Sequence, residues 1–280
     1  MRDVPFSVYL MVLPAGYCVY FLWSSLSYQE ELPSWPLILA IVLMVVTYIF
    51  SHQINMWWWN KYPPRLDPKL ASFLERVSSF FAALGNEERQ RFEHRMALFM
   101  SDKNFIAKRS RDMPLEEDIK ALIAHECIRL TIRLDEYMMD HYGDIIVYDH
   151  PFATPRIESL HSIETYHEDG VLVLSREQLI NGYAPDQINI ALIAAIKMWI
   201  RMNPRVNFPD LTPYSREEIA AVCKLDLDAM DQLTGDHTVG KLGLLVYAMF
   251  TGQRPPQFDR AVQTLSDLFY LTEERVSLQD

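Results

Sequence analysis

Hydrophobic and polar positions divide this chain into two parts with different patterns. The first part contains two long stretches, residues 4–29 and 34–59, without Asp, Glu, Lys or Arg. From residue 61 onward charged residues are frequent, and apolar residues recur at steps of three and four, the spacing of one helix face. This pattern is densest over residues 185–204, which are apolar nearly all round. Such a helix lies at the centre of a core, so we expect the other elements to pack around it.

The same periodicity predicts the remaining elements. Helices are expected over about 70–84, 86–99, 116–135, 215–223 and 239–250, with a last helix ending near Leu271, and strands over 145–148 and 171–174. The polar residues 154–170 are expected to form an exposed edge strand or a hairpin loop. For the central helix, Asp186 is the predicted N-cap, and Asn203-Pro204 is the predicted end because a proline disfavours helical geometry in the residue before it.

The two uncharged stretches are each long enough to cross a bilayer. A hydrocarbon core of about 30 Å needs about 20 apolar residues as helix, and spans over about 5–27 and 35–57 meet this requirement. Three aromatic residues and a cation at the end of the second span are predicted to lie at the membrane interface: Trp57, Trp58, Trp59 and Lys61. A cleaved signal peptide is the alternative for the first stretch, but no small-residue cleavage motif follows it. We therefore expect a two-helix transmembrane hairpin over residues 1–60 and a separate domain over residues 61–280.

The distribution of charge predicts an orientation and excludes one class of partner. Arg2 precedes the first span, and Lys61, Arg65 and Lys69 follow the second, whereas the loop between the spans has no Lys or Arg. The positive-inside rule then places the N-terminus and the domain over 61–280 in the cytoplasm. The net charge of −11 and the absence of a basic stripe argue against nucleic acid as a partner.

The central stretch and the segment before it carry a family resemblance. An apolar run, Gly170–Ser175, precedes a helix in which residues 189–197 read Asn-Ile-Ala-Leu-Ile-Ala-Ala-Ile-Lys. This order is similar to that of the Mlc-titration-factor (MtfA) family of zinc-dependent peptidases. The resemblance implies an α+β, mostly helical, zincin-like cytoplasmic domain. In that family the corresponding helix carries His-Glu-x-x-His, in which the two histidines hold zinc and the glutamate acts as base.

In this register, the positions that hold zinc in the family carry other side chains. The first histidine corresponds to Ile193, the glutamate to Ala194 and the second histidine to Lys197. A later helix supplies a third ligand in the family, and here it has Lys241 and Ala248 at the corresponding places. Aliphatic side chains offer no lone pair to a metal, and a cationic lysine repels one. The resemblance thus implies a vacated zinc site without catalytic residues, metal or other cofactor, and we expect a pseudopeptidase rather than an enzyme.

A metal site with an atypical ligand set is the alternative. His125-Glu126 resembles the start of a zinc helix, but Arg129 stands where the second histidine is required. His161 and His167 lie in the polar segment before the second strand. Zinc catalysis needs about three protein ligands and an open position. These three histidines would supply the ligands of a membrane-bound zinc metallopeptidase; otherwise His125 is expected on the polar stripe of an amphipathic helix.

The hairpin and the altered family site together predict an interaction protein. We expect an accessory, structural or regulatory subunit of a complex in the bacterial inner membrane. Its expected partners are integral membrane protein subunits and the lipid bilayer, with a soluble cytoplasmic protein as a further partner. Small residues in the first span, such as Ala15 and Gly16, allow close packing against other transmembrane helices.

Overall fold

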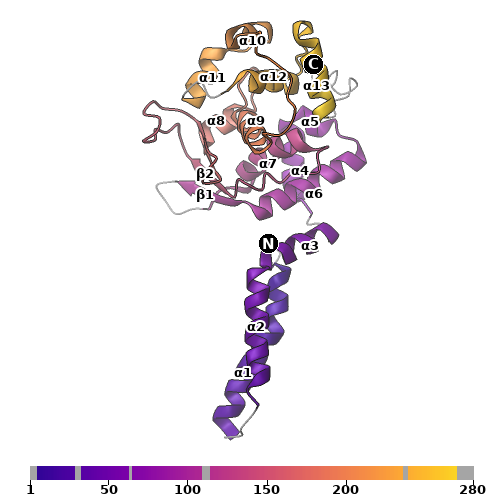
Figure 1. The fold of residues 1–280 in the computed structure, drawn as a ribbon, viewed down its shortest axis with the longest axis vertical. Coiled ribbons are helices and arrows are strands. Elements are labelled where there is room, and N and C mark those ends of the chain that lie inside the picture. Colours follow the sequence, from indigo (N-terminus) through magenta and orange to yellow (C-terminus); the bar gives the residue numbers. More distant parts are fainter. Residues whose placement is uncertain (1–4, 29–32, 63–64, 109–113, 236–238, 270–280) are drawn as a thin grey trace. The chain divides into compact units, whose positions relative to one another are not determined.

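The structure is a computed structural model, and it describes residues 5–28, 33–62, 65–108, 114–235 and 239–269 (Figure 1). The chain divides into two units, Met1–Pro64 and Arg65–Asp280. Each unit has its own internal contacts, and each is described by itself.

The first unit consists of apolar helices and a shorter, more polar one: α1 (Phe6–Tyr28), α2 (Trp35–Ile49) and α3 (Ser51–Lys61). Helices α1 and α2 lie side by side (Figure 1). At its beginning α1 also contacts α3. The backbone N–H of Ser7 donates to Oδ1 of Asn55 at 2.9 Å, and the ring of Phe6 stacks on Trp58 with 3.9 Å between the ring centroids.

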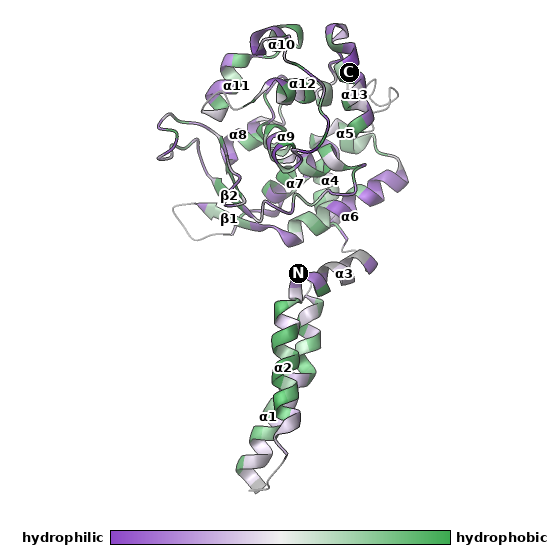
Figure 2. Cartoon of the chain, in the orientation of Figure 1, coloured by the Kyte–Doolittle hydropathy of each residue, from purple (hydrophilic) through white to green (hydrophobic). Residues whose placement is uncertain are grey.

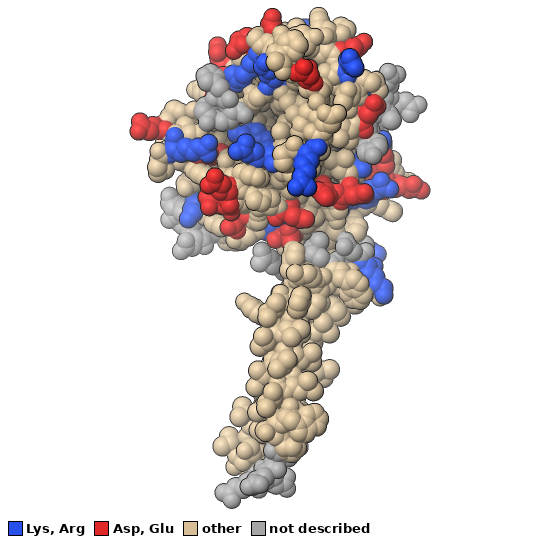
Figure 3. All heavy atoms as spheres, viewed as in Figure 1, with Lys and Arg blue, Asp and Glu red and all other residues tan. Residues whose placement is uncertain are grey.

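The outer surface of α1 and α2 is apolar. Large side chains such as Leu13, Leu26 and Tyr48 are exposed on it. Figure 2 colours most of both helices as hydrophobic, and Figure 3 shows no Lys, Arg, Asp or Glu side chain on their visible face. Among the described helices, α1 is the one that is long and apolar enough to cross a membrane by itself.

The predicted second span differs from the structure. Instead of one helix over 35–57, α2 ends at Ile49 and α3 continues after Phe50 with a bend of 73°. The bend falls where the apolar run ends, because Ser51 and His52 begin a polar stretch. With 15 residues, α2 alone is about 22 Å long, shorter than a hydrocarbon core of about 30 Å. The two-span hairpin is therefore not confirmed, and a crossing by α2 and α3 together stays a prediction.

The second unit contains a small mixed sheet. Its strands are β1 (Asn104–Lys108), β2 (Asp144–Tyr148), β3 (Ile163–Tyr166) and β4 (Val171–Ser175). The order in the sheet is β1-β2-β4-β3, with β1, β2 and β4 parallel and β3 antiparallel to β4 at the edge. Strands β2 and β4 were predicted. Strand β1 was missed, and β3 lies at the sheet edge inside the polar segment 154–170, for which an edge strand or a hairpin loop was expected.

Helices make up most of the second unit. They are α4 (Pro68–Val77), α5 (Ser79–Ala82), α6 (Asn86–Asp102), α7 (Glu117–Thr131), α8 (Arg176–Asn181), α9 (Ile190–Met202), α10 (Arg216–Val222), α11 (Leu227–Thr234), α12 (Lys241–Phe250), the 3₁₀ helix η1 (Pro256–Phe258) and α13 (Asp259–Phe269). The predicted α+β, mostly helical class is thus confirmed for this unit. The predicted capping box at the start of α10 is also present, with both reciprocal bonds between Ser215 and Glu218.

Helix α9 lies at the centre of this unit, as its sequence predicts. It packs against α7, α12, β3 and β4, and Figure 1 shows it surrounded by the other elements. Every residue from Ile190 to Ile196 is buried, and so are Met198 and Trp199. The apolar side chains on almost all sides of α9 therefore contact protein.

Three local expectations need correction. The central helix begins at Ile190 and not at Asp186, because Asn189 provides the N-cap while Asp186 has a left-handed φ of 59°. The helix expected over 70–84 breaks at Ser78, which adopts an extended conformation and caps α5. His125 is fully buried and does not lie on an exposed polar stripe.

Candidate binding cleft beside helix α9

The position of α9 depends on polar contacts at its first turn. Oδ1 of Asn189 accepts from the backbone N–H of Leu192 at 3.1 Å, which caps the helix. Nδ2 of Asn189 donates to Oε1 of Glu126 on α7 at 3.0 Å, and its backbone N–H donates to the hydroxyl of Tyr247 on α12 at 3.0 Å. One residue thus joins the start of α9 to both neighbouring helices.

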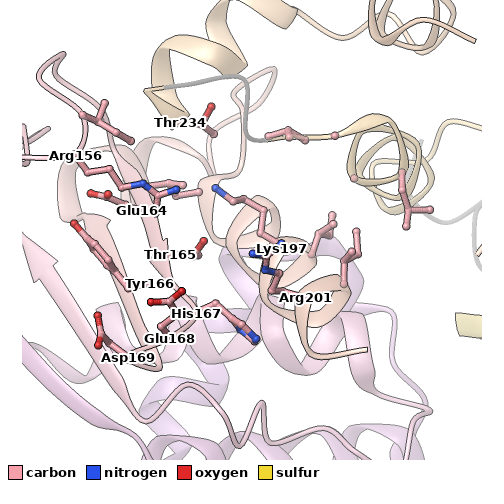
Figure 4. Close-up of a pocket in the computed structure, with 18 residues that line it drawn as sticks. Arg156, Glu164, Thr165, Tyr166, His167, Glu168, Asp169, Lys197, Arg201 and Thr234 are labelled. Atoms are coloured by element: carbon pink, nitrogen blue, oxygen red, sulfur yellow. The ribbon is translucent and has the colours of Figure 1, made fainter. Parts of the chain in front are cut away.

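A cleft of about 690 Å³ lies between β3 and α9 (Figure 4). Residues 163–169 form one wall, and one side of α9 forms the other, with Ile196, Lys197, Ile200 and Arg201. Three further segments complete the lining: Arg156 and Ile157; Thr234; and Val239, Gly240, Leu242 and Gly243. Successive side chains of a strand point to opposite faces of the sheet, and both Glu164 and Thr165 line the cleft. The cleft therefore lies along the edge of β3 and not over one face of the sheet.

The outer edge of β3 has main-chain groups that do not pair with β4. The backbone N–H of Ser175 donates to the carbonyl of Ser162 at 2.9 Å. Hydrogen-bonded residues alternate along an antiparallel pair, so Glu164 also bonds toward β4, while the main-chain groups of Ile163 and Thr165 point to the outer edge. Such an edge can accept a further extended segment.

The two walls of the cleft carry opposite charges. Lys197 and Arg201, one turn apart on α9, both point toward the strand wall, which carries Glu164, Glu168 and Asp169 (Figure 4). Lys197 is half-buried and Arg201 is exposed, while Glu168 and Asp169 are exposed on the turn after β3. Solvent screens the charges of Arg201, Glu168 and Asp169, which are all exposed, whereas Glu164 and Lys197 lie deeper in the cleft.

The deepest carboxylate in the cleft belongs to Glu164, which forms a buried pair with His161. His161 is 1% and Glu164 3% exposed, and Nε2 of His161 lies 3.3 Å from Oε2 of Glu164. The other ring nitrogen, Nδ1, donates to the carbonyl of Ser159 at 2.8 Å. The second carboxylate oxygen, Oε1, is buried and has no hydrogen-bond partner among the described residues.

A second group of polar rings lies at the end of the cleft. The hydroxyl of Tyr142 forms a hydrogen bond with Nδ1 of His167 at 3.1 Å, and Nε2 of His141 donates to the carbonyl of His167. Burial, then the positive charges of His141 and Arg201, lower the pKa of the His167 imidazole. The carboxylate of Glu168 opposes this effect on the pKa of His167.

On another side of α9, Glu126 lies in a buried polar network. Its Oε1 accepts from Nδ1 of His125 at 3.1 Å as well as from Asn189, and its Oε2 accepts from Arg129 at 3.4 Å. Burial alone would raise the pKa of the Glu126 carboxyl, but Arg129 and then His125 outweigh it and lower the pKa to about 2. The ring of His125 packs edge-on against Phe92, within an apolar and aromatic environment. These contacts make the His125-Glu126 pair a structural element that joins α7 to α9.

The histidines of the alternative ligand set belong to separate environments. His125 lies in the α7 network, His161 pairs with Glu164, and His167 contacts Tyr142. In the part of the chain that the structure describes, no group of three or more His, Cys, Asp and Glu side chains could hold a metal ion. At the register positions of the zinc helix, Ile193 and Ala194 are buried in the core. The side chains of Ile193 and Ala194 do not fit a zinc ion, because they offer it no lone pair.

Sequence reasoning identified Lys197 and His167 as residues of interest but missed two cations of the cleft. Arg201 follows Lys197 by four residues on a helix that is otherwise apolar, and this spacing was a usable signal. Arg156 carries no comparable signal, because it reaches the cleft from a loop.

Two comparisons place these observations among known proteins. The family model described as glucose-regulated metallo-peptidase M90 matches residues 55–193. An uncharacterized protein of Synechocystis sp. is 26% identical to the chain over 137 residues, which cover 48% of this chain and 49% of the relative. The aligned part thus spans about half the length of that curated relative.

The family match corrects one prediction and confirms another. The predicted resemblance to the MtfA-like zinc peptidases is confirmed over residues 55–193. The prediction that the chain is not an enzyme is wrong, because the matched family is one of metallo-peptidases. The match ends at Ile193, so Ala194 and Lys197 lie beyond it, and the vacated-site register stays a prediction.

Proposed function

Because residues 55–193 belong to the glucose-regulated metallo-peptidase M90 family, we propose that this chain is a membrane-anchored family member that binds an extended polypeptide in the cleft between β3 and α9. The observation that carries this proposal is the open edge of β3. The outward main-chain groups of Thr165, which is partly exposed, border a cleft of about 690 Å³, whereas Ile163 is buried. A polypeptide that adds to such an edge gains main-chain hydrogen bonds, and the side chains of the cleft then provide specificity.

The first unit would serve as the anchor. Helix α1 supports one crossing, and α2 with α3 would make the second, with the bend at Phe50 near the membrane interface. Trp57, Trp58 and Trp59 lie on α3, and Nζ of Lys61 is 5.7 Å from the centroid of the Trp57 ring, an arrangement that suits the headgroup region. This topology leaves the N-terminus and the second unit in the cytoplasm of a bacterial inner membrane.

The anchored protein would act with other membrane proteins. Exposed apolar side chains along α1 and α2 can contact lipid or the spans of integral membrane subunits. Mild detergent extraction followed by native mass measurement should then give a complex of fixed composition. A chain that migrates alone at all protein concentrations would refute the accessory-subunit part of the proposal.

Peptide binding is tested with the full chain in nanodiscs and a fluorescein-labelled library of short, unstructured peptides of mixed sequence. Thr165→Pro removes an outward N–H from β3, and proline is tolerated at sheet edges. The matched control is Ala107→Pro, at an outward position of the opposite edge strand β1, since Asn104 bonds inward to Gly143. We expect Thr165→Pro to abolish binding and Ala107→Pro to retain it, with both variants unfolding at the same temperature.

The same mixture reports on hydrolysis. New peptide termini, found by mass spectrometry and abolished by Thr165→Pro, would place peptide-bond cleavage at this cleft, and the zinc content of the purified protein is measured in parallel. Equal library binding by Thr165→Pro and the unaltered protein would refute the edge-strand proposal.

A further inference from the structure

The charged side chains of the cleft do not favour a ligand of either sign. Three cations and three carboxylates occur among the described residues that line it: Arg156, Lys197, Arg201, Glu164, Glu168 and Asp169. Figure 4 shows them around the same cleft, with the α9 cations facing the strand wall. Because opposite charges are present in equal number, net charge gives no basis for selecting a ligand. Selection among peptides is left to the uncharged part of the lining.

Apolar residues line the cleft where α9 meets α12. Ile196 and Ile200 lie one turn apart on α9, while Val239 and Leu242 lie just before and within the first turn of α12. The two helices approach closely at Gly243, since a Cβ there would lie 3.7 Å from Cγ2 of Ile196. Ile196 and Val239 are each only 2% exposed, whereas Ile200 and Leu242 are half-buried. The last two residues therefore keep apolar surface that a ligand can cover.

Gly240 leaves space open beside this apolar section. It lines the cleft, is exposed and is the N-cap residue of α12. Its φ of −68° and ψ of 170° lie in the extended region, so the backbone does not require a glycine here. No described atom lies within 4 Å of the position that a Cβ would take. A large side chain at this position would occupy space that the glycine leaves to a ligand.

We propose that this apolar section is a specificity subsite, which receives an apolar side chain of the peptide bound along β3. This inference rests on the proposed peptide binding at β3 and adds the class of side chain that is selected. A strand added beside β3 continues the sheet, and its alternate side chains point to the face on which α9 packs. An apolar side chain that covers Ile200 and Leu242 removes their surface from water, whereas a polar one loses hydration against them.

Matched peptides test this selection. Binding to the full chain in nanodiscs is measured for a short, fluorescein-labelled, Ser- and Thr-rich peptide whose central residue is Ala, Leu, Asn, Asp or Lys. We expect the Leu peptide to bind about ten-fold more tightly than the Ala peptide, because each fully buried methylene contributes a factor of about four. The Asn, Asp and Lys peptides should bind no more tightly than the Ala peptide. The preference for Leu should persist in high salt, which screens interactions between charges.

Substitutions in the cleft test the assigned residues. Gly240→Phe should remove most of the preference for Leu while the Ala peptide still binds. Ile200→Thr and Leu242→Asn make the subsite more polar, and each should lower the Leu-to-Ala affinity ratio several-fold. Because Gly240 is exposed, Gly240→Phe keeps the test decisive even where a change at Ile200 or Leu242 disturbs folding.

Two positions outside the cleft provide matched controls. Gly85 is also an exposed helix N-cap with an extended backbone and open space at its Cβ, so Gly85→Phe is the control for Gly240→Phe. Ile180 is a 43% exposed apolar residue on α8, and Ile180→Thr is the control for Ile200→Thr. Both control variants should keep the preference for Leu unchanged.

The possible failures are distinguishable. Leu and Ala peptides that bind equally, while Thr165→Pro still abolishes binding, would overturn the apolar selection and leave the proposed function intact. Tighter binding of the Asp or Lys peptide than of the Leu peptide would do the same. A preference for Leu that persists in Gly240→Phe and in the double variant Ile200→Thr with Leu242→Asn would overturn the assignment to this section. Absence of binding by every peptide would overturn both the selection and the proposed function.

Discussion

The Glu126 carboxylate is predicted to be a major source of stability for the second unit. It is 1% exposed and accepts hydrogen bonds from His125, Asn189 and Arg129, on α7 and at the start of α9. Glu126→Gln retains the size of the side chain but removes its charge. The substitution removes the carboxylate partner of Arg129, whose side chain is 13% exposed, and removing one partner of a largely buried ion pair is costly.

The magnitude follows from the pKa of this carboxyl. The neighbouring groups lower the pKa of Glu126 from 4.5 to about 2, and each unit corresponds to about 1.4 kcal/mol. The ionised carboxylate therefore contributes about 3 kcal/mol to the free energy of unfolding at neutral pH. Because the folded-state pKa is the lower one, this contribution is fully present above about pH 4.5. It is lost as the pH falls toward 2.

Urea unfolding of the full chain, followed by tryptophan fluorescence and circular dichroism, measures this contribution. At pH 7, Glu126→Gln should unfold at a clearly lower urea concentration than the unaltered protein, and the two midpoints should converge between about pH 4 and pH 2. Glu117→Gln is the matched control on the same helix, since its 64% exposed side chain forms a surface ion pair worth less than about 1 kcal/mol. Equal midpoints for the two variants, or a difference independent of pH, would refute the reasoning.

Three further predictions concern the backbone, the anchor and a buried thiol. Gly170→Ala should lower the melting temperature markedly, because φ is 66° and a Cβ would overlap a main-chain oxygen; Gly85→Ala, where a Cβ meets open space, should not. Leu13→Arg should weaken retention of the chain in carbonate-washed membranes by about 3 kcal/mol of insertion free energy, whereas Leu160→Arg, an exposed position of the second unit, should have no effect. Burial raises the pKa of the Cys127 thiol to about 12, so at pH 8 a thiol reagent should label it only after unfolding, and rapid native labelling would contradict its burial.

Much of the second unit could be predicted because its signals are local. The central position of α9 follows from apolar residues on almost every side, and the capping box at Ser215 and Glu218 is a four-residue pattern that formed as expected. Strands β2 and β4 were recognisable because both are short apolar runs at the centre of the sheet. Their neighbour β3 reads Ile-Glu-Thr-Tyr, and such a polar strand is defined by its pairing with β4 more than by its own composition.

The buried polar groups could not be predicted, because their partners are distant in the sequence. His125 and Glu126 read as surface residues of an amphipathic helix, yet Asn189 reaches Glu126 from 63 residues away. A carboxylate is buried only where such partners compensate its lost hydration, and no window of sequence around Glu126 contains Asn189. The same holds for the first unit, where Asn55 contacts Ser7 across 48 residues near the bend that interrupts the predicted second span.

The candidate cleft combines both kinds of information. The cations on its α9 wall, Lys197 and Arg201, are separated by one helical turn and could be read from the sequence. The wall that faces these cations could not be read in the same way. It forms because β3 pairs antiparallel with β4 and because His161 is buried against Glu164. The contact between Nε2 of His161 and Oε2 of Glu164, at 3.3 Å, thus depends on a strand pairing that no short stretch of sequence reveals, whereas the α9 wall follows from one local repeat.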